Sequence, residues 1–243
     1  MKPSVLIGIS WCGTHNKGDE RSSLTAIRYS PEEHLRWLAE SVDLHASVAN
    51  SLGRPSRVVV TASGYPSILQ VPAGPERLLY WEVMERVTFL AHPENLGHQR
   101  GAALCIRLGL EAAGYWGYRY YLHTAEDVIP RPGAAAALLE DLDGGLDYAS
   151  QVRPEGSANC TFFAARVAPL AARFDIHEVR HYQGLEQYLW SLVRDWRHSP
   201  VTDEHHSALY QTTHDHAEYR RWLSDLPSGP VPMIRTMSDY DRR

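Results

Sequence analysis

The chain has 243 residues, enough for one domain with a sizeable core, and 44% of them are apolar. Its formal net charge of -5 gives no electrostatic basis for non-specific binding to a polyanion, although a local basic groove remains compatible with it. The N-terminal MKPSVLIGIS is too short an apolar run for a signal peptide, and no other stretch has the length of a membrane span. Three scattered cysteines in no metal-binding spacing are typical of reduced thiols, which predicts a cytoplasmic protein.

Apolar runs and helical patterns alternate along the first part of the chain. Residues 4–11 (SVLIGISW) are β-branched and apolar, which is typical of a buried strand. Ser30-Pro31 followed by two glutamates supplies an N-cap, a proline at the first helical position and first-turn acids, which predicts a helix over 30–53. The elements expected next are a strand over 57–63, a helix over 76–87 and a strand over 87–92.

The same alternation continues to about residue 167. The expected elements are a helix over 97–114, a strand over 118–124, a helix over 132–142 begun by proline, strands over 146–152 and 158–167, and a helix after them. Strands that alternate with helices predict an α/β fold with a mostly parallel sheet and helices on both faces.

Two adjacent carboxylates, Glu126 and Asp127, follow the apolar strand YRYYLH and precede the turn IPRP. In open α/β sheets, ligands bind outside the carboxyl ends of the strands, which is where these residues fall. The pair could hold a metal ion, or it could simply cap the helix expected near Pro132. The position at the end of a strand favours the metal.

Residues 86–132 resemble the nucleotide-sugar-binding half of the GT-A glycosyltransferases, most closely the family 2 group. In that family a strand is followed by Asn-x-Gly, a helix, an apolar strand, an Asp-x-Asp motif and a proline. The matching residues are Asn95, Gly97 and Ala125-Glu126-Asp127 before Pro130. Downstream, SANCTFFAARV and GLEQYLW (184–190) resemble the strand after the acceptor loop and the start of the helix that carries the catalytic carboxylate. The resemblance covers roughly residues 4–195.

The chain departs from the family pattern at three places. Ala125 replaces the first motif aspartate, and VVVTASG ends the second strand without the aspartate that contacts uracil in many relatives. Gln187 stands where family 2 often has its aspartate base, which leaves Glu186 as the candidate. Glu186 could equally be an ordinary first-turn acid.

The resemblance implies a GT-A-like, Rossmann-like domain over 1–195 that binds nucleotide-sugar and acceptor. It also implies a His-rich C-terminal extension over 196–243 that packs on the same domain and could act as a lid. Mn2+ or Mg2+ would bridge the donor's phosphates, held by Asp127 and completed by His214 or His216. A polar extension that merely happens to be rich in histidine is the alternative for that segment.

The donor implied by the resemblance is a UDP- or GDP-sugar. Its expected contacts are Ser10, Trp11 and Ser63 at strand ends, Asn95, Gly97 and Arg100 around a helix N-terminus that can face phosphate, and Glu126. Asn95 as a helix cap, Arg100 as a solvated charge and Trp11 as a core residue are the alternatives. The acceptor could be a glycan, a lipid-linked carrier, a small molecule or a modified nucleic acid base.

Two other functions fit parts of the sequence. The missing aspartate at position 125 is compatible with a non-catalytic nucleotide- or sugar-binding module on the same fold. The stretch His177-Glu178-x-x-His181 matches the pattern of zinc hydrolases, although Gly184 interrupts any helix there.

Overall fold

The computed structural model describes residues 2–12, 30–64, 83–93, 96, 98–201, 209–213 and 215–226. Its elements are β1 (Val5–Cys12), α2 (Pro31–Ser51), β2 (Ser56–Ser63), β3 (Thr88–His92), α4 (His98–Tyr115), β4 (Tyr120–Ala125), β5 (Val128–Pro130), α5 (Ala134–Asp143), β6 (Tyr148–Ala149), β7 (Val152–Arg153), β8 (Ser157–Ala158), β9 (Phe163–Arg166), α6 (Val167–Arg173), the 3-10 helix η2 (Glu178–His181), α7 (Leu185–Val193), β10 (Tyr210–Thr212) and α8 (His216–Ser224). Of the helix expected over 76–87, residues 83–87 are described, and residues 83–86 are helical.

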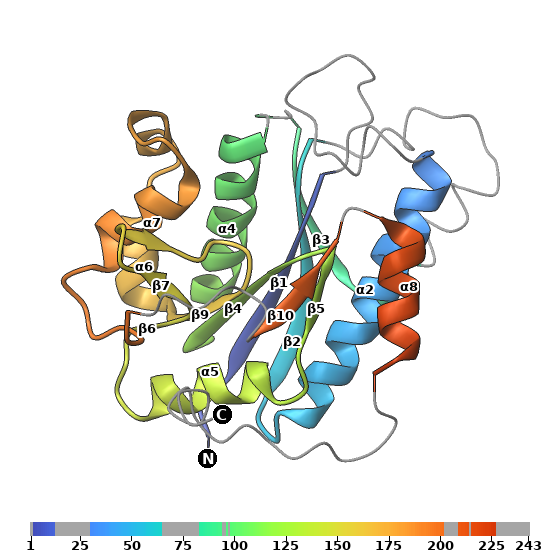
Figure 1. Cartoon of the computed structure of the whole chain (residues 1–243), viewed down its shortest axis with the longest axis horizontal. Helices are drawn as coiled ribbons and strands as arrows, with labels where there is room; N and C mark the ends of the chain where they lie inside the picture. The colour runs from blue at the N-terminus through green and yellow to red at the C-terminus, as the bar shows by residue number, and fades with distance from the viewer. Residues whose placement is uncertain are drawn as a thin grey trace.

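A central sheet has the strand order β3-β2-β1-β4-β9-β6 (Figure 1). Strands β3, β2, β1 and β4 are parallel to one another, whereas β9 is antiparallel to both of its neighbours. The predicted α/β fold with a mostly parallel sheet is therefore confirmed.

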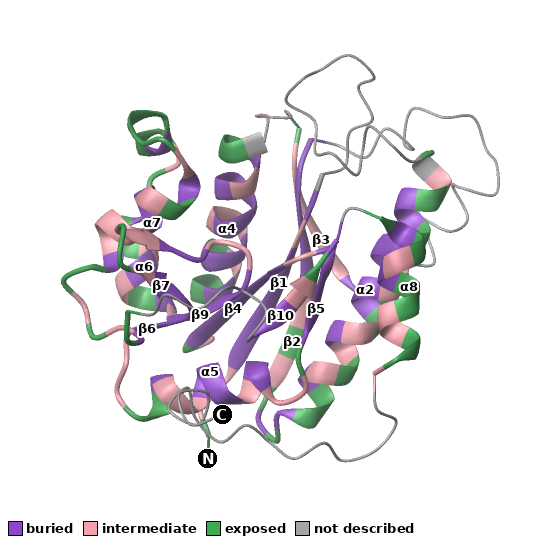
Figure 2. Cartoon of the chain, in the orientation of Figure 1, coloured by how far each residue is buried: buried purple, intermediate pink, exposed green. Residues whose placement is uncertain are grey.

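Helices cover both faces of this sheet, because successive side chains of a strand point to opposite faces and those of β1 are apolar in both directions. Leu6 joins a core cluster with α4, α6 and α7, whereas Val5 and Ile7 join one with α2 and α5. Helix α8 packs beside α2 (Figure 1) through a smaller cluster that includes Trp37 and Tyr219. Strands β1, β2 and β4 are mostly buried, the edge strand β3 is half-buried, and the outer sides of the helices are exposed (Figure 2).

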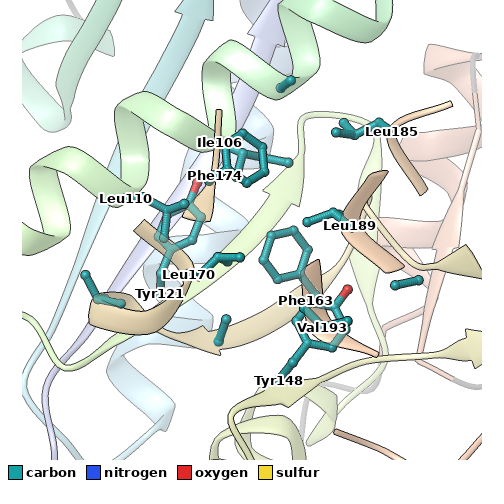
Figure 3. Packing of buried hydrophobic residues seen from close by; sticks show 14 of the residues in the cluster. Ile106, Leu110, Tyr121, Tyr148, Phe163, Leu170, Phe174, Leu185, Leu189 and Val193 are labelled. Atoms are coloured by element: carbon teal, nitrogen blue, oxygen red, sulfur yellow. The ribbon is translucent and has the colours of Figure 1, made fainter. Parts of the chain in front are cut away.

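The cluster under α4 is built around large aromatic rings (Figure 3). Tyr121 and Phe163 pack edge to face, with ring centroids 6.2 Å apart. The Tyr121 ring occupies the space beside Gly8 of β1 and Gly109 of α4, where a Cβ atom would collide with it. Absent side chains at these two glycines thus let α4 pack closely on the sheet.

Helix α2 begins as the sequence predicts. Ser30 is the N-cap, its Oγ accepts a hydrogen bond from the backbone N–H of Glu33, and the Glu33 carboxylate accepts from the Ser30 backbone N–H at 2.9 Å. This reciprocal capping box fixes the first turn of the helix. His34 lies at this end of α2, so the capping box also fixes the position of His34, which the candidate functional site contains.

Two predicted strands are shorter than expected. The single strand predicted over 146–152 is divided into β6 and β7, and the strand predicted over 158–167 into β8 and β9. Asn159 explains the second division, because its Oδ1 accepts hydrogen bonds from the backbone N–H groups of Thr161 and Phe162 at 2.8 and 3.1 Å. These bonds close a local turn, so the backbone leaves the ladder there.

The segment after Asp127 also differs from expectation. Residues 128–130 form β5, which pairs antiparallel with β10 from the C-terminal part of the chain. Helix α5 starts at Ala134 rather than at Pro132, with Gly133 as N-cap at a φ of 81°. A left-handed conformation at this position favours glycine, which explains the later start.

Among the described residues, no helix combines the length and the apolar character that a membrane crossing requires. Cys105 and Cys160 are free thiols.

Candidate functional site

The polar residues of interest gather at the carboxyl edge of the parallel strands. Ser10 of β1 pairs in register with Ala125 of β4, and Ser63 of β2 pairs with Cys12. Glu126 and Asp127 follow β4 directly, and the two residues are 7% and 8% exposed. Helix α4 starts at this same edge (Figure 1), so its positive N-terminal end lies on the side of the two carboxylates.

Beneath Glu126 lies a buried histidine from α2. The Nε2 atom of His34 is 3.6 Å from Glu126 Oε1 and accepts a hydrogen bond from Trp11 Nε1–H at 3.1 Å. Burial lowers the pKa of His34 to about 3, although the charge of Asp127 acts in the opposite direction. His34 is therefore neutral at ordinary pH.

Trp11 is a core residue. Its ring is 2% exposed and packs edge to face on Phe89, with centroids 5.9 Å apart. Of the two interpretations of Trp11, the structure matches the core residue, because both faces of the indole lie within packed protein and its N–H is used by His34.

The two carboxylates do not cap α5. That helix has Gly133 as N-cap with no side-chain cap hydrogen bond, and β5 separates it from Asp127. Burial of two adjacent acids at a strand end is therefore not explained by helix capping.

The C-terminal part of the chain returns to this edge through β10. Thr212 pairs with Val128, the residue after Asp127, and the hydroxyl of Tyr210 accepts a hydrogen bond from Asn159 Nδ2 at 3.2 Å. Burial raises the pKa of Tyr210 to about 12, and the charges of Cys160 and Asp127 act in the same direction. Tyr210 thus connects β5, the strand after Asp127, to the loop that carries Cys160.

His216 is held by contacts within the protein. Its Nε2 atom is 2.9 Å from Glu40 Oε2, and its ring stacks on Trp37 with centroids 5.0 Å apart. Arg220 Nε donates to the other Glu40 oxygen at 2.7 Å. Burial raises the pKa of Glu40, but the hydrogen bonds from His216 and Arg220 outweigh it, so the pKa lies below its usual range. With Nε2 engaged by Glu40, that atom is not available to a metal ion in this arrangement.

Within the described ranges, no three or more His, Cys, Asp or Glu side chains come together in a way that could hold a metal ion. His214, the other predicted histidine ligand, lies outside those ranges. The buried oxygens of Asp127 and Glu126 nonetheless suit a hard cation such as Mg2+, which takes few protein ligands and keeps water or phosphate oxygens for the rest.

Glu186 lies in the first turn of α7, exposed at the surface. Its Oε1 atom accepts a hydrogen bond from the thiol of Cys160 at 3.2 Å. Gln99, in the first turn of α4, donates from Nε2 to the backbone oxygen of Gln183 at 3.2 Å and so ties the start of α4 to the segment before α7. The candidate base and the start of α4 are therefore neighbours.

Three of the remaining residues predicted to contact the donor lie in the described part of the chain. Ser10 Oγ donates to the backbone oxygen of Thr124 at 3.3 Å, and Ser63 Oγ accepts from the Leu96 N–H at 3.1 Å. Arg100 is exposed in the first turn of α4. Asn95 and Gly97 lie outside the described residues.

The zinc-hydrolase pattern does not form the site that its spacing suggests. Residues 178–181 are a 3-10 helix with His177 as N-cap, and both histidines are exposed. With about three residues per turn, side chains four positions apart point roughly a third of a turn away from each other. His181 Nε2 instead accepts a hydrogen bond from Arg180 Nε at 3.2 Å.

Sequence analysis did not identify His34, Asn159, Cys160 or Tyr210 as members of this edge. His34 sits within an amphipathic helical pattern, where it looks like any core position. The turn at Asn159 could have been predicted, because an Asn directly before a β-rich run is typical of a turn. Tyr210 comes to the site through β10, whose pairing with β5 has no local sequence signature.

Comparison with known proteins gives little further information. No family model matches the chain, and no curated protein matches it. Among solved structures, a protein from Desulfovibrio desulfuricans G20 described as a "putative nucleotide-diphospho-sugar transferase" is similar, with 12% sequence identity, a TM-score of 0.48, and coverage of 82% of this chain and 79% of that one. Similarity at this level does not establish a shared activity.

Proposed function

We propose that the protein is a glycosyltransferase that moves a sugar from a UDP- or GDP-sugar to an acceptor hydroxyl with Mn2+ or Mg2+. The observation that carries the proposal is the pair of buried carboxylates directly after β4, at an edge that also holds the start of α4 and Glu186. The resemblance of residues 86–132 to GT-A enzymes agrees with it. The acceptor would be a glycan, a lipid-linked carrier, a small molecule, a protein or a modified nucleic acid base.

Asp127, supported by Glu126, would hold the cation through oxygen atoms. When bound, the cation would stabilise the negative charge that grows on the departing diphosphate. The first turn of α4, with Arg100, would face the same phosphates, because backbone N–H groups at a helix start bind anions. Neutral His34, whose Nε2 lies 3.6 Å from Glu126 Oε1, would add no positive charge to the site. His214 stays a candidate for a further ligand in the proposed lid.

Glu186 would act as the base. It would take the proton of the acceptor hydroxyl while the hydroxyl oxygen bonds to the anomeric carbon of the sugar. The bond between that carbon and the phosphate oxygen would break, and the nucleoside diphosphate would leave with the electron pair. Exposure of Glu186 suits this role, since the acceptor must reach it from solvent.

Release of nucleoside diphosphate from a panel of nucleotide sugars and acceptors tests the proposal. Glu186→Gln is expected to lower kcat by roughly a hundredfold or more with donor binding retained. Glu178→Gln, a change at a nearby exposed acid outside the site, is the matched control and should leave kcat unchanged. Retained turnover in Glu186→Gln would contradict the assignment of the base.

A non-catalytic nucleotide- or sugar-binding module is the second candidate. Ala125 in place of the first motif aspartate favours it. Binding of a nucleotide sugar without release of nucleoside diphosphate, under every metal and acceptor condition tried, would identify this function.

A further inference from the structure

The two carboxylate oxygens of Glu186 have different surroundings. Oε1 accepts a hydrogen bond from the thiol of Cys160 at 3.2 Å. Oε2 lies beside Gly184, where a Cβ atom would approach it to 3.0 Å, and among the described residues none donates a hydrogen bond to it. Of the two oxygens, Oε1 therefore has a hydrogen-bond donor and Oε2 has none within the described part of the chain.

Cys160 is itself held in place from both sides. The side chain of Asn159 accepts from the N–H groups of Thr161 and Phe162, and the Asn159 backbone N–H donates to the Gln151 oxygen at 2.9 Å. The thiol thus projects from a turn whose backbone is fixed, toward a helix start that is tied to α4 by Gln99. A donor in a rigid turn can hold the rotamer of its acceptor.

On the basis of the proposed function, we propose that Cys160 is a positioning residue for the base. Its thiol donates to Oε1 of Glu186 and so leaves Oε2 as the oxygen that receives the acceptor's proton. Gly184 contributes to the same arrangement, because a Cβ atom at this position would lie only 3.0 Å from Oε2.

The protonation state of the thiol suits this role. Burial, and then the charge of Glu186, raise the pKa of Cys160 well above its usual value of 9.0, so it stays a hydrogen-bond donor at neutral pH. A thiol that keeps its proton can donate to one carboxylate oxygen of Glu186 and so fix the orientation of that group. Serine preserves a donor at this position, whereas alanine removes it, so the two variants separate hydrogen bonding from packing.

The contact can be tested without turnover. Alkylation of Cys160 by iodoacetamide, quantified by peptide mapping between about pH 7 and 10, reports the fraction of thiolate. Removing the neighbouring charge in Glu186→Gln is expected to raise the Cys160 rate at about pH 8.5 severalfold, while buried Cys105 is unchanged. Glu178→Gln is the matched control and should leave the rate unaltered. An unchanged Cys160 rate in Glu186→Gln would overturn the proposed contact.

The role in catalysis is tested by measuring kcat and KM separately. Cys160→Ala is expected to lower kcat with KM nearly unchanged, because the base loses its fixed orientation while donor and acceptor still bind. Cys160→Ser, which keeps a hydrogen-bond donor, is expected to restore most of kcat. An unchanged kcat in Cys160→Ala, or a serine variant as impaired as the alanine variant, would contradict the positioning role. If the wild type transfers no sugar, the proposed function fails and the catalytic role with it, whereas the alkylation rates still decide whether the contact exists.

Discussion

The Nε2 atom of His34 lies 3.6 Å from Oε1 of Glu126, and this contact joins the first turns of α2 to the end of β4. The same Nε2 accepts the N–H of Trp11, so the proton of the neutral ring is on Nδ1. One buried imidazole therefore links the core of the molecule to the carboxylates at its edge.

This link predicts that His34→Leu destabilises the fold. Leucine fills the space but leaves the buried Trp11 N–H without its acceptor, at a cost of about 1–3 kcal/mol in the free energy of unfolding. His34→Gln, which can still accept that hydrogen bond, should cost less. Urea denaturation followed by tryptophan fluorescence measures both. Equal losses in the two variants would show that the hydrogen bond to Trp11 is not what matters.

Acid should destabilise the protein between about pH 6 and 5 more than carboxylate titration alone would. Burial lowers the pKa of His34 and His123 to about 3 and that of His45 to about 4, although a backbone hydrogen bond with Ser41 partly opposes the shift at His45. In the unfolded chain all three histidines take up protons below about pH 6.5, whereas in the folded state they do not. Their stabilising effect is therefore complete above that pH and is lost as the pH falls.

Where the unfolded chain binds three more protons than the folded chain, the free energy of unfolding changes by about 4 kcal/mol per pH unit. His45→Gln lies away from the candidate site and should reduce this slope by roughly a third. Urea denaturation across the pH range measures the slope. A slope that is the same in wild type and His45→Gln would contradict a neutral, buried His45.

Close packing of Tyr121 against Gly109 predicts that Gly109→Ala is destabilising. A Cβ atom there would lie 2.6 Å from Tyr121 Cε2, in a part of the core where the ring is fully buried. Such overpacking costs about 1–3 kcal/mol. Gly114→Ala on the same helix is the matched control, because its Cβ would meet only Val167 at 3.8 Å. The control should stabilise by up to about 1 kcal/mol through helix propensity. Similar effects of the two changes on the melting temperature would contradict the packing described.

Helix α8 is expected to depend on Glu40. Glu40→Ala removes the partner of both His216 and Arg220, so α8 should exchange its amide hydrogens faster and the fold should lose about 1 kcal/mol. Asp43→Ala, an exposed acid on the same helix, should change the stability by less than about 0.5 kcal/mol. Exchange over residues 216–224 that is unaffected by Glu40→Ala would show that the ion pair does not hold α8.

The parts of the fold that could be predicted are those with local signals. The apolar run of β1 and the Ser30-Pro31 start of α2 both lie within a few residues, and each predicted its element correctly. The pairing of β5 with β10 joins segments far apart in the chain, and nothing in either segment specifies the other. The turn at Asn159 divided a predicted strand. The Asn159 side chain accepts hydrogen bonds from two backbone N–H groups that would otherwise pair with a neighbouring strand.

The residues of the candidate site also differ in whether a local sequence signal predicted them. The position of Glu126 and Asp127 followed from the end of a strand, and Glu186 from the start of a helix. Their neighbours His34, Cys160 and Tyr210 arrive from separate elements, so only the tertiary structure brings them together. The spacing of His177 and His181 suggested a shared helix face, but a 3-10 turn separates the two side chains.

The central claim is that Asp127 binds a divalent cation together with a nucleotide-sugar. The most direct test is the melting temperature with a panel of nucleotides and nucleotide sugars, with and without Mn2+, for wild type, Asp127→Ala and the control Asp195→Ala, an exposed acid distant in sequence. A ligand that binds only the folded state must raise the melting temperature. A Mn2+-dependent rise with a nucleotide sugar that is lost in Asp127→Ala and kept in Asp195→Ala is the predicted result. No rise with any donor, or a rise that Asp127→Ala leaves intact, would contradict the claim.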